Sequence, residues 1–235
     1  MKIGLFSDPH YCKVERLGET RMPTLSYNKV KEAMEHFKAQ KVDICFCLGD
    51  LTDSPEGVTK DDAKRNLEEI LCLINSYNIP FYVVPGNHDF ITLTREDLLK
   101  AGIKTPPYVV ENEYSFIILD ANYRSNMEHF DTAGVVWTDS NLPKEQIDFL
   151  KTALNESKKP VIVLVHENLD PSLEETHIIK NANEIREIIK NSGKVKMVIQ
   201  GHFHGGNEIM VDDIPYFTVG GMCEKDINPY FVKEI

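Results

Sequence analysis

The sequence has no long apolar run, few cysteines and a shortage of basic residues. No stretch approaches the roughly 18 consecutive apolar residues of a membrane-spanning helix, so we expect no membrane partner. The opening MKIGLFSDPH turns polar too early for a signal peptide, which predicts a cytoplasmic protein. Lys and Arg total 26 against 37 Asp and Glu, a net charge of −11. Such an acidic chain is not expected to bind a nucleic acid strand, and any phosphate it handles requires a local source of positive charge.

The five cysteines lack the spacing of a zinc knuckle or a redox pair. Cys45 and Cys47 alternate within VDICFCLG, so both are expected on one face of a strand. Cys12 follows DPHY, close to candidate site residues, but nothing around it indicates a nucleophile. We therefore expect buried thiols in a reducing compartment.

Short apolar runs alternate with amphipathic stretches along the chain. The runs are 2–7, 42–49, 80–86, 114–120, 160–166 and 195–202, followed by 207–211 and 215–221, and the stretches of helical period are 26–40, 61–77, 143–157 and 183–191. The runs are too continuous for half-exposed hairpins and suit a sheet covered on both faces, with hairpin-like strands from about 207 onward. With no repeat or linker, the pattern predicts a single α/β domain over residues 1–235. One long irregular region, 121–142, is of a length that is usually functional or mobile.

Metal-ligand residue types follow five of these runs. The clusters are DPH (Asp8, His10), GDLTD (Asp50, Asp53), GNHD (Asn87, His88, Asp89), the single His166, and GHFH (His202, His204). In open α/β sheets, ligands bind outside the carboxyl ends of the strands, so the five clusters should meet at one edge. Asp, Asn and His without Cys suit Mn²⁺, Fe²⁺ or Zn²⁺, and seven plausible ligands among these ten residues are too many for one ion. They suit two ions that share one carboxylate.

The ordered set D-x-H, GDxxD, GNHD, strand-end His and GHxH resembles the calcineurin-like metallophosphoesterases over roughly residues 1–221. Within that superfamily the chain is most similar to class III cyclic-nucleotide phosphodiesterases and Mn-dependent ADP-ribose/CDP-alcohol diphosphatases, through LPKEQIDFLKTAL and GHFHGGNEI. The family usually has HxP after the fourth histidine, whereas this chain has HENLDP. The resemblance implies a four-layer α/β/β/α sandwich, with mixed sheets flanked by helices.

The resemblance also implies roles for single residues. One ion would be held by Asp8, His10, Asp50 and His204, and the other by Asp50, Asn87, His166 and His202. The cofactors would be two divalent ions, Mn²⁺ or Fe²⁺/Fe³⁺, with Zn²⁺ as an alternative, and they would activate a hydroxide as the nucleophile. His88 would be the catalytic acid rather than a ligand. Asp53 or Asp89 would orient neighbouring imidazoles.

Three further residues are candidate contacts to the substrate: Arg21 after the first cluster, and Asn122 and His129 in the long irregular region. The first hypothesis is hydrolysis of a phosphodiester or pyrophosphate bond in a small nucleotide-like substrate. The alternatives are a phosphomonoesterase, including a protein phosphatase, a DNA nuclease, and a binding scaffold without catalysis. The acidic balance disfavours the nuclease, and the full ligand set with His88 disfavours the scaffold. The sequence leaves the oligomeric state open.

Overall fold

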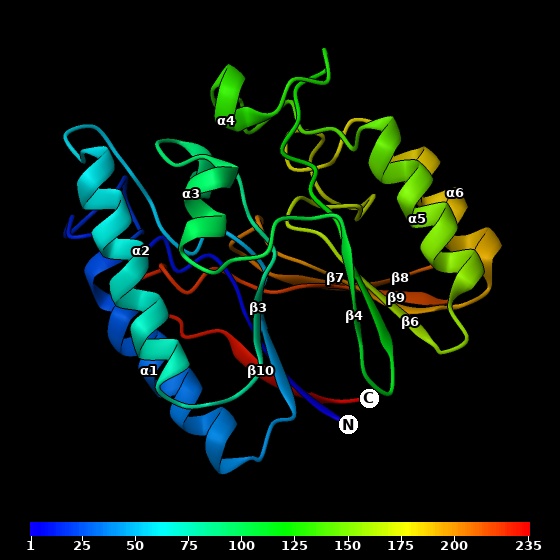
Figure 1. Ribbon diagram of the computed structural model, residues 1–235, viewed down its shortest axis with the longest axis horizontal. Helices are drawn as coiled ribbons and strands as arrows, with labels where there is room; N and C mark the ends of the chain where they lie inside the picture. Colours follow the sequence, from blue (N-terminus) through cyan, green and yellow to red (C-terminus); the bar gives the residue numbers. More distant parts are fainter.

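The first of two sheets is built mainly from the N-terminal third of the chain. In the computed structural model, which describes residues 1–235, its strand order is β10 (Tyr230–Glu234), β1 (Lys2–Phe6), β2 (Ile44–Cys47) and β3 (Phe81–Val83). β1, β2 and β3 are parallel, and β10 pairs with β1 in the antiparallel sense. Helices α1 (Pro23–Ala39) and α2 (Lys60–Asn75) cover the outer face (Figure 1).

The second sheet has six strands and holds the rest of the chain. Its order is β4 (Tyr108–Glu111), β5 (Ser115–Ile118), β6 (Val161–Leu164), β7 (Val195–Gln200), β9 (Ile214–Thr218) and β8 (Asn207–Val211). The inner four strands are parallel, while β4 and β8 run antiparallel to their neighbours. Helices α5 (Lys144–Glu156) and α6 (Ala182–Ser192) cover its outer face (Figure 1). The expected four-layer arrangement with two mixed sheets is therefore confirmed.

Apolar packing joins the four layers. A core between the sheets includes Phe46 of β2 and Phe116 of β5, whose ring centroids lie 4.9 Å apart. Each sheet also packs against its own helices, and both faces of the inner strands are thereby buried. This burial explains why the inner strands read as continuous apolar runs. No helix combines the length and apolar character that crossing a membrane requires.

Some elements were not predicted from the sequence. The edge strands β4 and β10 have half-exposed positions and lack a long apolar run. The short helices α3 (Arg95–Lys100), α4 (Phe130–Ala133) and the 3₁₀ turn η1 (His88–Phe90) are too brief for a helical period to stand out. Cys45 and Cys47 do lie together in the core under α1 and α2. Cys72 is exposed, so the expectation of buried thiols is wrong at that position.

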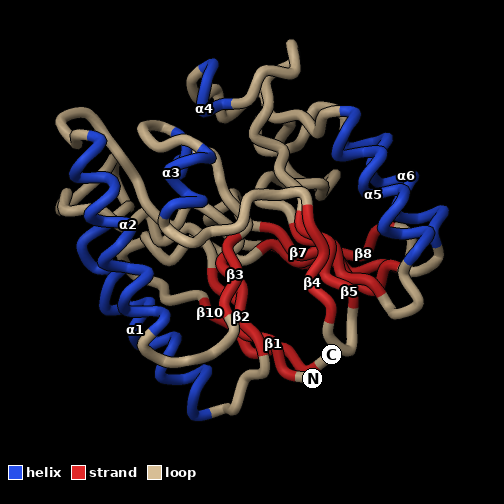
Figure 2. Tube along the Cα trace, viewed as in Figure 1, coloured by secondary structure: helices blue, strands red, loops and turns tan.

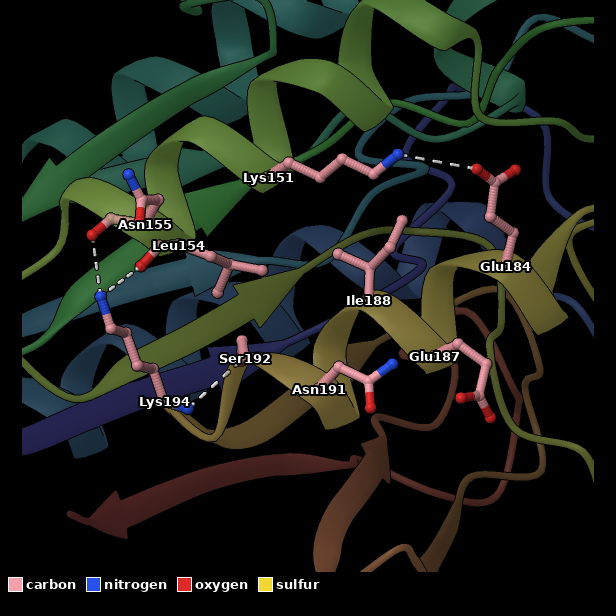
Figure 3. Close-up of a pocket in the computed structure, with 9 residues that line it drawn as sticks. All are labelled: Lys151, Leu154, Asn155, Glu184, Glu187, Ile188, Asn191, Ser192 and Lys194. Atoms are coloured by element: carbon pink, nitrogen blue, oxygen red, sulfur yellow. Dashed lines mark hydrogen bonds and ion pairs between the residues drawn. The ribbon is translucent and has the colours of Figure 1, made fainter.

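A groove of about 520 Å³ lies between α5 and α6, away from all predicted site residues (Figure 3). Lys194 crosses its end and donates to the carbonyl oxygens of Leu154 (2.7 Å) and Asn155 (2.9 Å) at the end of α5. A lysine there satisfies carbonyls that lack helical partners and complements the negative end of the helix dipole. The arrangement has a structural role, which is to fix α5 on the strand that follows α6.

The loops that follow the parallel strands gather at one edge of both sheets, and the two termini lie at the opposite end (Figure 2). The 121–142 region belongs to these loops, and its only helix is the single turn of α4. The edge where the loops meet is the one at which the sequence predicts the five clusters to converge.

Candidate metal centre

The seven predicted ligands come from five strand ends and meet in one buried cluster. Asp8 and His10 follow β1, Asp50 follows β2, Asn87 follows β3, His166 follows β6, and His202 and His204 follow β7. Three sets of residues have ligand atoms close enough to hold an ion. These sets are Asp50 with His166 and His202, His10 with Asp50 and His88, and His10 with His204 and Cys223.

The backbone leaves the strands in unusual conformations. Asp8, His10, Asp50 and His202 all have positive φ angles, between 47° and 67°. Non-glycine residues occupy this left-handed region at a cost, and such outliers concentrate at functional sites. Gly86 allows the chain after β3 to approach Asp50 closely, because a Cβ at this position would overlap Asp50 Oδ1. The local chain is thus shaped to bring side chains and backbone into close approach.

Asp50 occupies the centre of the cluster. Its Oδ2 atom lies 3.4 Å from Nε2 of His10 and 3.4 Å from Nε2 of His166. Its Oδ1 atom accepts a hydrogen bond from the backbone N–H of His88 at 2.7 Å. Ligand atoms that share one ion are expected about 3–3.5 Å apart, because metal–ligand bonds are about 2.0–2.2 Å long. The spacing on both sides of Asp50 fits that expectation.

The imidazoles of His10 and His204 face each other with their unprotonated nitrogen atoms. His10 Nδ1 lies 3.0 Å from Asp53 Oδ2, and His204 Nδ1 lies 2.7 Å from Glu224 Oε1. A carboxylate only accepts, so each Nδ1 carries the proton and each Nε2 a lone pair when the imidazole is neutral. The two Nε2 atoms are nevertheless 3.1 Å apart. A shared cation or a proton must separate them.

His166 repeats the pattern on the other side of Asp50. Its Nδ1 atom lies 2.6 Å from the carbonyl oxygen of Leu48, which can only accept, so Nδ1 is the donor. Its Nε2 atom then faces Asp50 with no hydrogen-bond partner. Three other predicted ligands also have a buried atom without a hydrogen-bond partner, among eleven such atoms in the chain: Asp8 Oδ1, Asn87 Oδ1 and His202 Nε2. Buried polar atoms are rarely left unpaired, so this donor set fits divalent cations.

The charged groups of the cluster shift one another's pKa values. Burial raises the pKa of Asp50, but His166, His88 and His10 outweigh burial and lower it well below the usual value. Burial lowers the pKa of His202 to about 3, with His166 adding to that effect. Asp50 is therefore ionised and His202 neutral near pH 7, the states in which each can bind a metal ion.

His88 and Arg21 lie at the mouth of the cluster beside Asp53. His88 Nδ1 is 3.0 Å from Asp53 Oδ1, and an Arg21 guanidinium nitrogen is 3.6 Å from Asp53 Oδ2. The His88 side chain is 22% exposed and that of Arg21 is 30% exposed, so solvent and ligands reach both. Burial lowers the pKa of His88, but Asp50 and Asp53 more than offset it, and the pKa is raised. Asp53 thus contacts His10, His88 and Arg21 together.

Of the two carboxylates expected as alternatives to orient the imidazoles, only Asp53 contacts them. Asp89 contacts no imidazole; its carboxylate accepts the backbone N–H groups of Thr52 (3.1 Å) and Gly86 (2.9 Å). Its role is to tie the loop after β2 to the loop after β3. Asp89 follows His88 on the tight turn η1, so the two side chains point to different sides. The sequence alone does not reveal which side each one takes.

Asn122 and His129 are not at the cavity. Asn122 is fully buried and donates to the carbonyl oxygen of Pro85 (3.0 Å), whereas His129 Nε2 lies 3.0 Å from Asp120 and caps α4. The Asn122 amide nitrogen and both ring nitrogens of His129 hold the 121–142 region to the body of the domain. The expectation that they contact a substrate is therefore not supported by their positions.

A cavity of about 420 Å³ opens over the cluster, and it includes residues that the sequence analysis did not select. These residues are Trp137, His177, Phe203 and Gly205, in addition to Arg21, His88 and five of the predicted ligands. Glu224, which accepts from His204, was also missed. Phe203 and Gly205 lie in GHFHGGNEI and Trp137 lies in the 121–142 region, so their segments gave a signal; His177 and Glu224 come from loops whose paths are set by the tertiary fold.

Fold and cluster together define a hydrolase built around a metal-binding site. The calcineurin-like phosphoesterase family profile matches residues 1–206, and the chain belongs to this family. As a member of it, the protein is a metallophosphoesterase, a hydrolase that acts on phosphoester bonds.

Known proteins of this kind are similar at low identity. The 3′,5′-cyclic adenosine monophosphate phosphodiesterase CpdA of Haemophilus influenzae is 23% identical over 209 residues, which cover 87% of this chain and 70% of that protein. A dimetal phosphatase from Danio rerio has the same fold, with a TM-score of 0.81 at 17% identity over 95% of this chain and 88% of that one. A purple acid phosphatase from yellow lupin matches with a TM-score of 0.62 at 15% identity, over 94% of this chain and 44% of that one.

Proposed function

We propose that the protein hydrolyses a phosphodiester or pyrophosphate bond of a small nucleotide-like substrate at two divalent metal ions. The observation that carries the proposal is the position of Asp50 Oδ2 between the Nε2 atoms of His10 and His166, 3.4 Å from each. Asp50 would be shared, with Asp8, His10 and His204 on one side and Asn87, His166 and His202 on the other. When bound, the two ions would supply an activated water and charge stabilisation for an in-line displacement at phosphorus.

His88 is the proton donor in this proposal. Its raised pKa keeps a larger fraction protonated at neutral pH, as a general acid requires. Asp53 would orient the ring, because its Oδ1 atom lies 3.0 Å from His88 Nδ1 and the His88 side chain lines the cavity. The proton would pass from the imidazole to the leaving oxygen of the substrate. Arg21 would bind a phosphate oxygen, since its guanidinium lines the same cavity.

A small substrate is favoured over a nucleic acid strand because the net charge is −11 and the cavity holds about 420 Å³. The diester preference is supported by the similar protein named as a cyclic AMP phosphodiesterase, and the monoester alternative by the phosphatases of the same fold.

The test is hydrolysis of bis-p-nitrophenyl phosphate and of p-nitrophenyl phosphate by protein loaded with Mn²⁺. We expect a higher kcat/KM for the diester. A rate with the monoester alone would overturn the diester assignment and establish the alternative. Hydrolysis of neither ester by protein that contains two ions per chain would favour the binding scaffold. Nucleotide pyrophosphates and cyclic nucleotides would then be assayed, and hydrolysis of none of them would establish the scaffold.

A further inference from the structure

Trp137 forms part of the wall of the cavity, although it belongs to the 121–142 region and not to any metal-ligand motif. Its side chain is 44% exposed, and its ring centroid lies 6.0 Å from that of His202. An isolated exposed aromatic residue is common on protein surfaces. This one is different because it stands beside a predicted metal ligand, at the place where a substrate must enter.

Two other rings continue the wall. The ring centroid of His177 lies 5.5 Å from that of Trp137 and 5.6 Å from that of His202. Phe203 follows at 5.3 Å from His177. Trp137, His177 and Phe203 come from three separate loops, and we call them the aromatic wall. It lies on the His202 side of the cluster, whereas His88 and Arg21 lie beside Asp53 and His10.

The backbone that carries Trp137 is fixed while its ring remains open to solvent. Ser140 Oγ donates to the carbonyl oxygen of Trp137 (3.4 Å), and Asp139 N donates to that of Val136 (2.8 Å). The Asp139 carboxylate accepts from Ser125 N at 3.0 Å, which closes the loop. A rigidly held, partly exposed indole offers a flat apolar surface at a low cost in entropy.

The charges around the cavity favour a neutral flat ring at this wall. Arg21 is the only Lys or Arg among the lining residues, and Asp50, which belongs to the metal cluster, is the only Asp or Glu. A phosphoryl group would be bound at the metal cluster and Arg21. The part of the substrate that extends past His202 would meet only aromatic faces, and those faces suit a nucleobase.

We propose that Trp137 stacks against the base of a nucleotide substrate and sets the preference of the enzyme for esters that carry one. The inference rests on the proposed function, which it deepens by assigning the specificity residue. Stacking on an aromatic side chain tolerates all bases, so the preference is for a base over none, with little choice among bases.

The sequence allows a direct binding test, because Trp137 is the only tryptophan in the chain. Mn²⁺-loaded protein is excited at the red edge of indole absorption, where nucleobases do not absorb. It is titrated separately with AMP, ribose 5-phosphate and inorganic phosphate. We expect a saturable fall in emission with AMP and little change with the other two. An equal response to all three, or no response to AMP at concentrations that inhibit hydrolysis, would overturn the proposal.

Kinetics of variants provide the second test. In Trp137→Ala we expect KM for a cyclic nucleotide or a nucleotide pyrophosphate to rise roughly 5- to 100-fold, with kcat and metal content nearly unchanged. Trp137→Phe should recover most of the loss. Val136→Ala, at the exposed neighbouring position, is the matched control and should behave as the wild type.

The two proposals fail in different ways. If the wild type hydrolyses no phosphodiester or pyrophosphate, the proposed function fails, and the AMP titration still decides whether Trp137 binds a base. If hydrolysis is present but Trp137→Ala leaves KM unchanged, or lowers kcat alone, the assignment of Trp137 is wrong and the proposed function stands.

Discussion

At the scale of single residues, most of the candidate site follows from side-chain chemistry. Aspartate, asparagine and histidine at strand ends predict an oxygen and imidazole cluster, and the structure places all seven predicted ligands around one cavity or in contact with the residues that line it. Their assignment to two ions stays a prediction. The partners that hold the imidazoles were harder to predict. Asp53 contacts His10 as expected, but Glu224 orients His204 from a loop 20 residues away, and its sequence neighbours carry no recognisable motif.

His88 offers a residue-scale test, because its ring also lies with His10 and Asp50 in a group that could hold an ion. In His88→Ala we expect turnover of the diester to fall by roughly 10²–10⁴, since the leaving oxygen loses its proton donor. Metal content should remain at the wild-type value, measured by mass spectrometry of the purified variant. The His88 backbone N–H to Asp50 is kept in this variant.

Two results would contradict the assignment of His88. Loss of one ion would identify it as a ligand, and an unchanged rate would exclude it as the acid. His36→Ala is a suitable control, because that histidine lies on α1 beside Tyr230 and away from the cavity.

At the scale of elements, burial decides what the sequence can reveal. The inner strands and the four long helices were predicted because each presents a continuous or periodic apolar pattern to a core. The partly exposed edge strands β4 and β10 were missed, although β8, an edge strand of similar exposure, was predicted. The 121–142 region was predicted as irregular, but the two residues that anchor it, Asn122 and His129, were predicted to contact the substrate. Asn122 and His129 instead bind to Asp120 at the end of β5.

Asp120 should make this anchor sensitive to pH. Burial raises its pKa, but hydrogen bonding and ion pairing with His129 and Arg95 lower it to about 2. Since the unfolded-state pKa is about 3.9, the ionised carboxylate stabilises the folded state above pH 4 by about 2–3 kcal/mol. This contribution is lost as the pH falls from about 4 towards 2. Asp120→Asn should therefore lower the free energy of unfolding near pH 6, and the difference from the wild type should shrink below pH 4.

Urea unfolding at several pH values measures this difference. Asp148→Asn, on the exposed face of α5, is the control and should change stability little at any pH. A difference between Asp120→Asn and the wild type that is constant from pH 6 to pH 3 would show that the carboxylate charge does not stabilise the anchor.

At the scale of the whole molecule, the fold explains how an acidic protein can act on phosphate. Two sheets packed face to face direct loops from distant parts of the chain to one edge (Figure 1). There, imidazole nitrogens and carboxylates surround positions suited to cations. Bound cations would supply the local positive charge that the chain, with a net charge of −11, lacks. The sequence predicted this edge, because strand order and parallel direction follow general rules. It did not predict the aromatic wall, whose three residues are adjacent only after the loops have folded.

The most direct measurement is the number of tightly bound Mn²⁺ ions per chain in the wild type and in Asp50→Ala, with circular dichroism to confirm that both are folded. Because Asp50 Oδ2 lies 3.4 Å from imidazoles on both sides, its loss should weaken both positions. We predict two ions for the wild type and none for the variant. Fewer than two in the wild type, or one retained in the variant, would contradict a carboxylate shared by a pair of ions.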